Sequence, residues 1–114
     1  MQIETLAWSE NTSDPLIEVA CFSDPTANSL VAGTGHFKAG QIMPASGFSQ
    51  YPMREISLIL EGSIRTESGG KTVVLKAGDM VTIPPNQKQS SHFLEDTKLV
   101  YLFFGFRENM QPNS

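Results

Sequence analysis

The amino-acid sequence predicts a single all-β domain, a barrel or sandwich built from short strands. Strand-like apolar runs alternate with turn-forming residues at intervals of roughly 8 to 12 residues, which is typical of such folds. The chain has 114 residues, a length that supports one hydrophobic core. Nine Gly and seven Pro residues favour tight turns and disfavour long helices. An all-β fold therefore accounts for both the pattern and the composition.

The first part of the chain, residues 1–28, is expected to be a short irregular lead-in that packs on the barrel or extends it. It contains two Asp-Pro dipeptides, which favour turns because the residue before a proline is biased away from helical backbone. The apolar segment Leu16–Phe22 lies between them and predicts either an edge strand or one helical turn. The barrel is expected over residues 29–107, and a polar tail over residues 108–114.

Each predicted strand of the barrel is a short run rich in aliphatic, β-branched or aromatic residues. Strong turn formers, such as Gly78-Asp79 and Pro84-Pro85, separate these runs. The predicted strands are Leu30–Phe37, Gln41–Met43, Phe48–Tyr51, Ile56–Leu60, Ser63–Thr66, Thr72–Leu75, Met80–Ile83, Ser90–Leu94 and Lys98–Phe106.

Two of these runs carry apolar residues on both faces. Side chains alternate along a strand, so a strand with one solvated face should alternate apolar and polar residues. In Ile56–Leu60 and in Leu99–Phe106 neither face is predominantly polar. We therefore expect the second face to be covered by the lead-in or by another subunit, and a homodimer is the simplest such arrangement.

Charge and hydropathy exclude several kinds of partner. The formal net charge is -4, from 12 acidic and 8 basic residues, and no basic stripe that would attract a phosphate backbone is present. No run of apolar residues is long enough to span a membrane, and residues 1–10 lack the pattern of a secretion signal. We expect a cytoplasmic protein that binds neither nucleic acid nor membrane. Cys21 is the only cysteine, which excludes an intrachain disulfide and a paired-cysteine metal site.

Two motifs resemble those of cupins, which have a double-stranded β-helix (jelly-roll) barrel. The first cupin motif ends with a Glu, six residues and a Gly, which Glu55 and Gly62 match. The second begins with a Gly, five residues and a Pro, which Gly78 and Pro84 match. The resemblance covers about residues 33–106 and, among cupins, is greatest to the ethanolamine-utilisation type and its small relatives. It implies a small single-domain cupin barrel.

The family's metal ligands are where this sequence departs from the pattern. The four ligand positions fall on Ser49, Tyr51, Glu55 and Gln89, so none of the three usual histidines is present. Serine, tyrosine and glutamine are poor ligands for Fe, Mn, Ni or Zn compared with histidine. The resemblance therefore implies a degenerate, metal-free site with no cofactor, and a metal ion at a displaced site is the alternative.

The two histidines of the chain, His36 and His92, could form such a displaced metal site only together with Glu55. Strand alternation counted from Gln89 turns His92 away from the barrel interior. A lone histidine on a strand, such as His36, is more often a hydrogen-bonded structural residue than a ligand. Neither histidine supports a metal site by itself.

If the cupin register holds, polar side chains gather at one end of the barrel within an apolar wall. A few convergent polar groups in such a wall are typical of a small-molecule site. The expected catalytic residues are Glu55 and Tyr51. The expected ligand-binding residues are Ser49, Gln89, Ser57 and Ile59.

These residues are compatible with several functions. In a metal-free isomerase, lyase or cyclase, Glu55 would be the general acid or base, and Tyr51 would donate a proton or a hydrogen bond. In a binding or sensing module the same side chains would only recognise a small molecule, and in a scaffold they would only satisfy one another. A metal-dependent dioxygenase or isomerase with a displaced site is a further alternative. The sequence does not decide whether the protein is an enzyme, because one fold hosts all of these functions.

Overall fold

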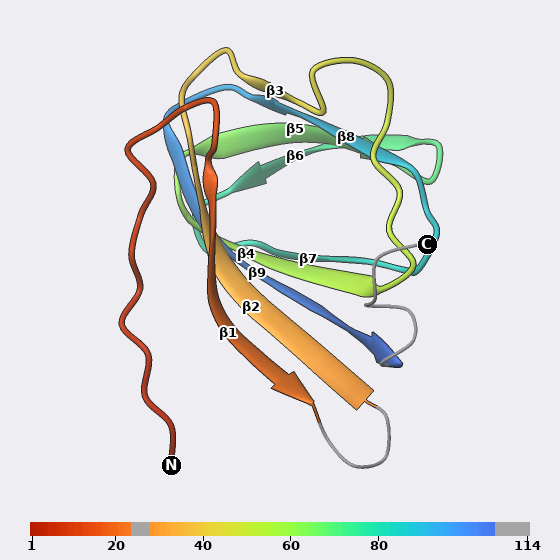
Figure 1. Ribbon diagram of the computed structural model, residues 1–114. Helices are drawn as coiled ribbons and strands as arrows, with labels where there is room; N and C mark the ends of the chain where they lie inside the picture. Colours follow the sequence, from red (N-terminus) through yellow and green to blue (C-terminus); the bar gives the residue numbers. More distant parts are fainter. Residues whose placement is uncertain (24–27, 107–114) are drawn as a thin grey trace.

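The computed structural model describes residues 1–23 and 28–106 and contains two antiparallel β-sheets that face each other (Figure 1). Within these ranges the regular elements are all strands. No helix in the described part of the chain is long and apolar enough to cross a membrane. The expected all-β architecture is therefore confirmed.

The strands follow one another along the chain with short connections. They are β1 (Leu16–Ser23), β2 (Asn28–Phe37), β3 (Ile42–Met43), β4 (Arg54–Glu61), β5 (Ser63–Ser68), β6 (Lys71–Lys76), β7 (Met80–Ile83), β8 (Gln89–Phe93) and β9 (Thr97–Phe106).

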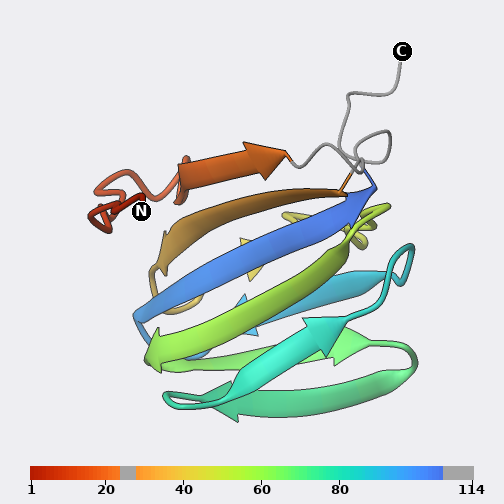
Figure 2. The same cartoon turned by 90° about the horizontal axis from the view of Figure 1, so that it is seen from below.

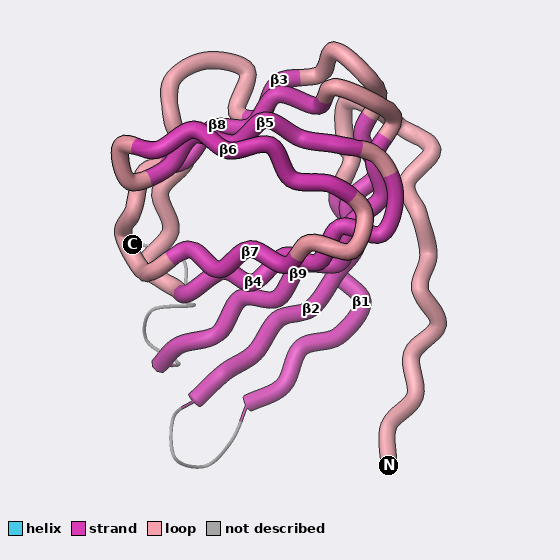
Figure 3. The backbone as a smooth tube through the Cα atoms, turned by 180° about the vertical axis from the view of Figure 1, so that it is seen from behind, coloured by secondary structure: helices cyan, strands magenta, loops and turns pink. Residues whose placement is uncertain are grey.

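The chain crosses repeatedly between the two sheets. One sheet has five strands in the order β1-β2-β9-β4-β7, and the other has four in the order β3-β8-β5-β6 (Figure 2). Seen from behind, β5, β6 and β8 lie opposite β4, β7 and β9, so that these strands form the two walls of the barrel (Figure 3). The strands β1 and β2 continue the five-stranded sheet beyond this enclosed part.

The predicted runs correspond to strands of the structure with one exception. The segment Leu16–Phe22 forms the edge strand β1, which was one of its two expected conformations. The expected strand Phe48–Tyr51 is wrong, because only Ser49 pairs there, in an isolated bridge with Gln89. Pro52 lacks a backbone N–H, so a hydrogen-bonded ladder cannot continue through it. The expected tail 108–114 lies outside the described residues.

The core lies between the sheets and includes a pair of stacked phenylalanine rings. Phe37 of β2 and Phe93 of β8 are each 2% exposed, and their rings stack with centroids 3.9 Å apart and an interplanar angle of 8°. Ile59, Ile64 and Leu99 pack against this pair. The stacked rings therefore join the two sheets in the core of the barrel.

The lead-in covers part of the outer face of the five-stranded sheet. The Thr34 hydroxyl donates a hydrogen bond to the Ala7 carbonyl at 2.5 Å, and His36 Nδ1 contacts the Ser9 carbonyl oxygen at 2.7 Å. Further along this sheet Leu58 and Phe104 remain 39% and 40% exposed. The lead-in thus covers the end of the face near β1 and β2, and apolar residues of β4 and β9 stay open to solvent.

The turn between β4 and β5 depends on Gly62. Its φ is +89°, and a Cβ atom there would lie against the backbone of Asp96 and Thr97. We predict that Gly62→Ala lowers the free energy of unfolding by about 2 to 4 kcal/mol, because it adds a steric overlap to the backbone strain. Urea unfolding followed by circular dichroism measures this change.

Gly78→Ala is the matched control for this prediction. Gly78 has a φ of +94°, but no atom lies within 4 Å of the position its Cβ would take. Only the backbone term of about 1 kcal/mol is expected there. Equal losses of stability in the two variants would show that the contact with Asp96 and Thr97 is unimportant.

Candidate functional site

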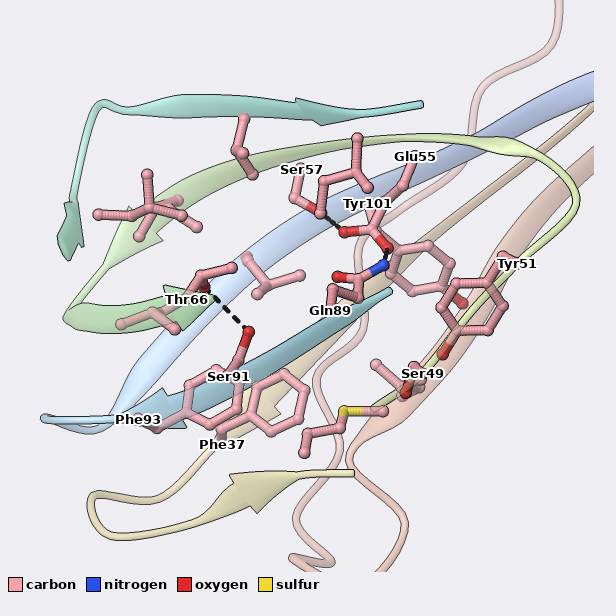
Figure 4. Close-up of a pocket in the computed structure, with 18 of the residues that line it drawn as sticks. Phe37, Ser49, Tyr51, Glu55, Ser57, Thr66, Gln89, Ser91, Phe93 and Tyr101 are labelled. Carbon is pink, nitrogen blue, oxygen red and sulfur yellow. Dashed lines mark hydrogen bonds between the residues drawn. The ribbon is translucent and has the colours of Figure 1, made fainter. Parts of the chain in front are cut away.

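A cavity of about 90 Å³ lies between the sheets, beside the stacked rings of Phe37 and Phe93 (Figure 4). Its wall is mainly aliphatic and aromatic, and polar side chains enter it from both sheets. These polar lining residues are Ser49, Tyr51, Glu55, Ser57, Thr66, Gln89, Ser91 and Tyr101. The cavity therefore combines an apolar wall with a small number of convergent polar groups.

The alternation of β4 brings Glu55, Ser57 and Ile59 to the cavity. Inside it Ser57 Oγ donates a hydrogen bond to Glu55 Oε2 at 3.1 Å, and Gln89 Nε2 donates one to Glu55 Oε1 at 2.9 Å. Both carboxylate oxygens thus have a partner. Gln89 comes from the opposite sheet, so its bond to Glu55 connects the two walls of the barrel.

Burial dominates the electrostatics of Glu55. Removal of the carboxylate from water raises its pKa above the ordinary value of 4.5, and the hydrogen bonds from Gln89 and Ser57 oppose this shift. The pKa of Tyr101 is also raised, by burial and then by the negative charge of Glu18. Glu55 is consequently a carboxyl group that accepts a proton more readily than one in water.

Ser49 is fixed at the edge of the cavity by its backbone. Its N–H donates to the Gln89 carbonyl at 2.8 Å, and its carbonyl accepts from the Gln89 N–H at 2.9 Å. Gln89 therefore holds the loop between β3 and β4 with its backbone while its side chain holds Glu55. These contacts account for the placement of two sequence-predicted residues that lie 40 positions apart.

Tyr51 takes part in an aromatic cluster. The centroid of its ring lies 5.1 Å from that of Phe103, and the Phe103 centroid lies 5.4 Å from that of Tyr101. Among the described residues no hydrogen bond joins Tyr51 to Glu55, whose partners are Ser57 and Gln89. All six residues expected to act at the site thus line the cavity, but the two expected catalytic residues are not paired with each other.

Sequence reasoning did not assign some of the polar residues that line the cavity. Thr66 of β5 and Ser91 of β8 have their hydroxyl oxygens 2.9 Å apart. Ser91 follows Gln89 by two positions, so strand alternation places it on the same face. The sequence did not indicate that Thr66 lies in the cavity, because its strand contains neither cupin motif. The position of Tyr101 in the wall depends on its pairing with Ser57 of β4.

The displaced metal site considered from the sequence is wrong, because His36 and His92 do not reach Glu55. His36 faces the lead-in, where it contacts Ser9, and His92 Nδ1 lies 2.9 Å from Arg65 Nη2. Neither histidine lines the cavity. Strand alternation explains both placements, since each histidine follows or precedes an inward-facing residue such as Phe37 or Phe93.

The donor set of the cavity does not fit a transition metal. Glu55 is its one carboxylate, and no imidazole or thiolate is among the lining residues. The remaining polar groups are hydroxyls and an amide, which bind such metals poorly. Across residues 1–23 and 28–106 no three His, Cys, Asp or Glu side chains are grouped as a metal would require.

Solved structures with the same architecture are numerous. KdgF from Halomonas sp. is 22% identical, with a TM-score of 0.71, and the alignment covers 92% of this chain and 91% of that one. An RmlC-like cupin from Shewanella frigidimarina is 17% identical, with a TM-score of 0.61 and coverage of 95% and 98%.

A third similar structure is an RmlC-like cupin family protein with a double-stranded β-helix fold from Methanocaldococcus jannaschii. It is 11% identical, with a TM-score of 0.67, and the alignment covers 93% of this chain and 90% of that one. At these identities the likeness concerns the fold, which is the double-stranded β-helix expected from the sequence. No curated protein matches the sequence significantly.

The sequence itself identifies the family. Residues 33–101, more than half of the chain, match the model of the EutQ-like cupin domain. This range contains the motif residues Glu55, Gly62, Gly78 and Pro84, and it spans both walls of the cavity. The chain therefore belongs to the cupin superfamily, as a EutQ-like cupin domain.

Proposed function

We propose that this cupin barrel binds a small organic molecule in the cavity at Glu55 and that side chains, without a metal, recognise it. The observation that carries the proposal is the hydrogen-bonded carboxylate of Glu55 within an apolar cavity. A buried charge is costly unless it has partners, and here Ser57 and Gln89 supply them. The site thus holds an oriented polar group where a ligand would meet it.

The other lining residues support recognition of a ligand. Ser49 and Tyr51 bring hydroxyl groups to the wall, and Thr66 with Ser91 adds a second polar pair. A small-molecule site typically combines a mostly apolar wall with a few placed polar groups. Ile59 and Leu99 provide apolar surface.

A second candidate function is proton transfer, and the raised pKa of Glu55 favours it. A carboxylate with raised proton affinity is a better general base at neutral pH than an ordinary one. It would take a proton from a carbon next to a carbonyl group, while the Tyr51 hydroxyl donated a hydrogen bond to the developing oxyanion. Isomerisation, elimination and cyclisation all begin with this step.

Blocking the cavity tests the binding function. We predict that Ser49→Phe abolishes binding of small-molecule fragments of about six to nine non-hydrogen atoms, because the new ring fills the edge of a cavity of about 90 Å³. Saturation-transfer difference NMR detects the bound fragments. Ser46→Phe is the control, since Ser46 is exposed on the same loop and does not line the cavity. Unchanged binding to Ser49→Phe would contradict the proposal.

Metal content tests the part of the proposal that concerns recognition without a metal. We predict well below one Fe, Mn, Ni or Zn per chain, because the cavity offers a single carboxylate and no imidazole. The measurement is elemental analysis by mass spectrometry after expression in medium that contains all four metals. Near-stoichiometric metal would contradict the assignment of the site.

The pH dependence of stability tests the second candidate. Because the pKa of Glu55 is higher in the folded protein than in the unfolded chain, the folded state binds more protons between the two values. Its contribution to stability therefore falls as the pH rises from about 4.5 through the folded pKa. We predict that Glu55→Gln, which lacks this titration, becomes more stable relative to the wild type over that range.

Urea unfolding at a series of pH values measures this difference. Glu61→Gln is the matched control, because Glu61 is an exposed carboxylate on the same strand. Its stability relative to the wild type should show no comparable rise. A difference between Glu55→Gln and the wild type that is independent of pH would remove the support for proton transfer by Glu55.

A further inference from the structure

We propose that the ligand of the cavity is a small organic cation, an alkylammonium or quaternary ammonium compound that lies between Glu55 and the rings of Tyr51, Tyr101 and Phe103. This inference rests on the proposed binding function and specifies that the bound ligand is positively charged. It follows from the charges of the wall, the placement of the rings and the size of the cavity.

The wall of the cavity carries a negative charge without a positive one. Glu55 is the one carboxylate among the lining residues, and no Lys, Arg or His is among them. The neighbouring Arg54 lies on the opposite face of β4, where its Nη1 donates to Thr82 Oγ1 at 3.0 Å. A carboxylate or phosphate ligand would therefore meet repulsion and no counter-charge, whereas a cation would neutralise Glu55.

The hydrogen bonds of Glu55 leave its charge available. Burial raises the pKa of Glu55, and the hydrogen bonds that Ser57 and Gln89 donate to the carboxylate oppose this effect. Each oxygen of an ionised carboxylate can accept a further hydrogen bond, since a carboxylate has about four lone-pair positions. A bound ammonium group can thus contact Glu55 without displacing either partner.

Aromatic rings lie next to this carboxylate. Phe103 is the direct cross-strand neighbour of Glu55, and Tyr101 is that of Ser57, so both rings share the face of the sheet with Glu55. The Tyr51 and Phe103 rings are inclined by 56°, and the Tyr101 and Phe103 rings by 57°. Figure 4 shows the Tyr101 ring next to the Glu55 carboxylate, with Tyr51 nearer to Ser49. Ring faces attract cations within about 6 Å of their centroids.

The size of the cavity limits the ligand. A volume of about 90 Å³ holds several waters, because each requires about 10 to 15 Å³ by this measure. A ligand with a similar number of non-hydrogen atoms fits. Methyl groups on the ammonium nitrogen would contact apolar lining residues such as Val81 and Ile83. A strongly hydrated metal ion or an anion would lose its hydration against the same apolar surface.

Three probes of nearly the same shape test this inference. Choline carries a positive charge, 3,3-dimethylbutan-1-ol is its uncharged carbon analogue, and 3,3-dimethylbutanoate carries a negative charge. We expect choline to bind at least about tenfold more tightly than the alcohol and the anion not to bind. NMR titration of ¹⁵N-labelled protein follows the Gln89 side-chain amide, and the Trp8 indole, which contacts Lys98 outside the cavity, reports non-specific effects.

Two variants test whether choline binding depends on the charge of Glu55 and on the aromatic ring of Phe103. Glu55→Gln should weaken choline binding at least about tenfold and leave the alcohol almost unaffected, and Phe103→Leu should weaken choline about fivefold. Glu61→Gln and Phe104→Leu are the controls, because Glu61 is exposed and Phe104 lies on the outer face of β9. Phe103→Leu also keeps the test decisive if Glu55→Gln does not fold.

The outcomes separate this inference from the proposed function on which it rests. If the alcohol binds as tightly as choline, or if Glu55→Gln binds choline as the wild type does, the cationic ligand is overturned and the binding function stands. If none of the three probes binds, the cationic ligand is likewise overturned. The binding function itself fails only if fragments bind equally to the wild type and to Ser49→Phe, or to neither.

Discussion

The stacked rings of Phe37 and Phe93 fix the distance between the two sheets, and the rest of the barrel depends on that contact. Each ring comes from a different sheet, and each is 2% exposed. Ile59, Ile64 and Leu99 pack against the pair, so the contact is part of the buried core. The same two rings form part of the wall of the cavity that Glu55 enters. One aromatic contact therefore both joins the sheets and bounds the space between them.

Two opposing effects act on the pKa of Glu55 in the cavity. Burial of Glu55 disfavours its charge, and the hydrogen bonds from Ser57 and Gln89 favour it. Such a balance is sensitive to small changes in the surroundings, because low-dielectric environments strengthen every nearby charge and dipole. No Lys, Arg or His is among the lining residues, so the pKa of Glu55 depends on its burial, on its two hydrogen-bond donors and on any ligand. In the proposed binding function, Glu55 is therefore the residue whose ionisation a ligand would change.

Much of the fold could be predicted because it follows from local chemistry. Strand alternation placed Glu55, Ser57 and Ile59 on one face, and the resemblance to the second cupin motif placed Gln89 at the same site. The sequence alone did not show which distant segments pair with each other. The bond from Gln89 to Glu55 joins different sheets, and the pairing of Ser57 with Tyr101 depends on the register of β4 and β9. The segment Phe48–Tyr51 was expected to be a strand because composition does not show whether a partner strand is available.

The double backbone bridge between Ser49 and Gln89 links the edge of the cavity to the ionisation of Glu55. Movement of the β3–β4 loop away from β8 would break two main-chain hydrogen bonds to the residue whose side chain binds Glu55. The carboxylate would then lose a donor, which raises its pKa, and gain contact with water, which lowers it. Loop position and proton occupancy are therefore coupled to the extent that one of these two effects exceeds the other.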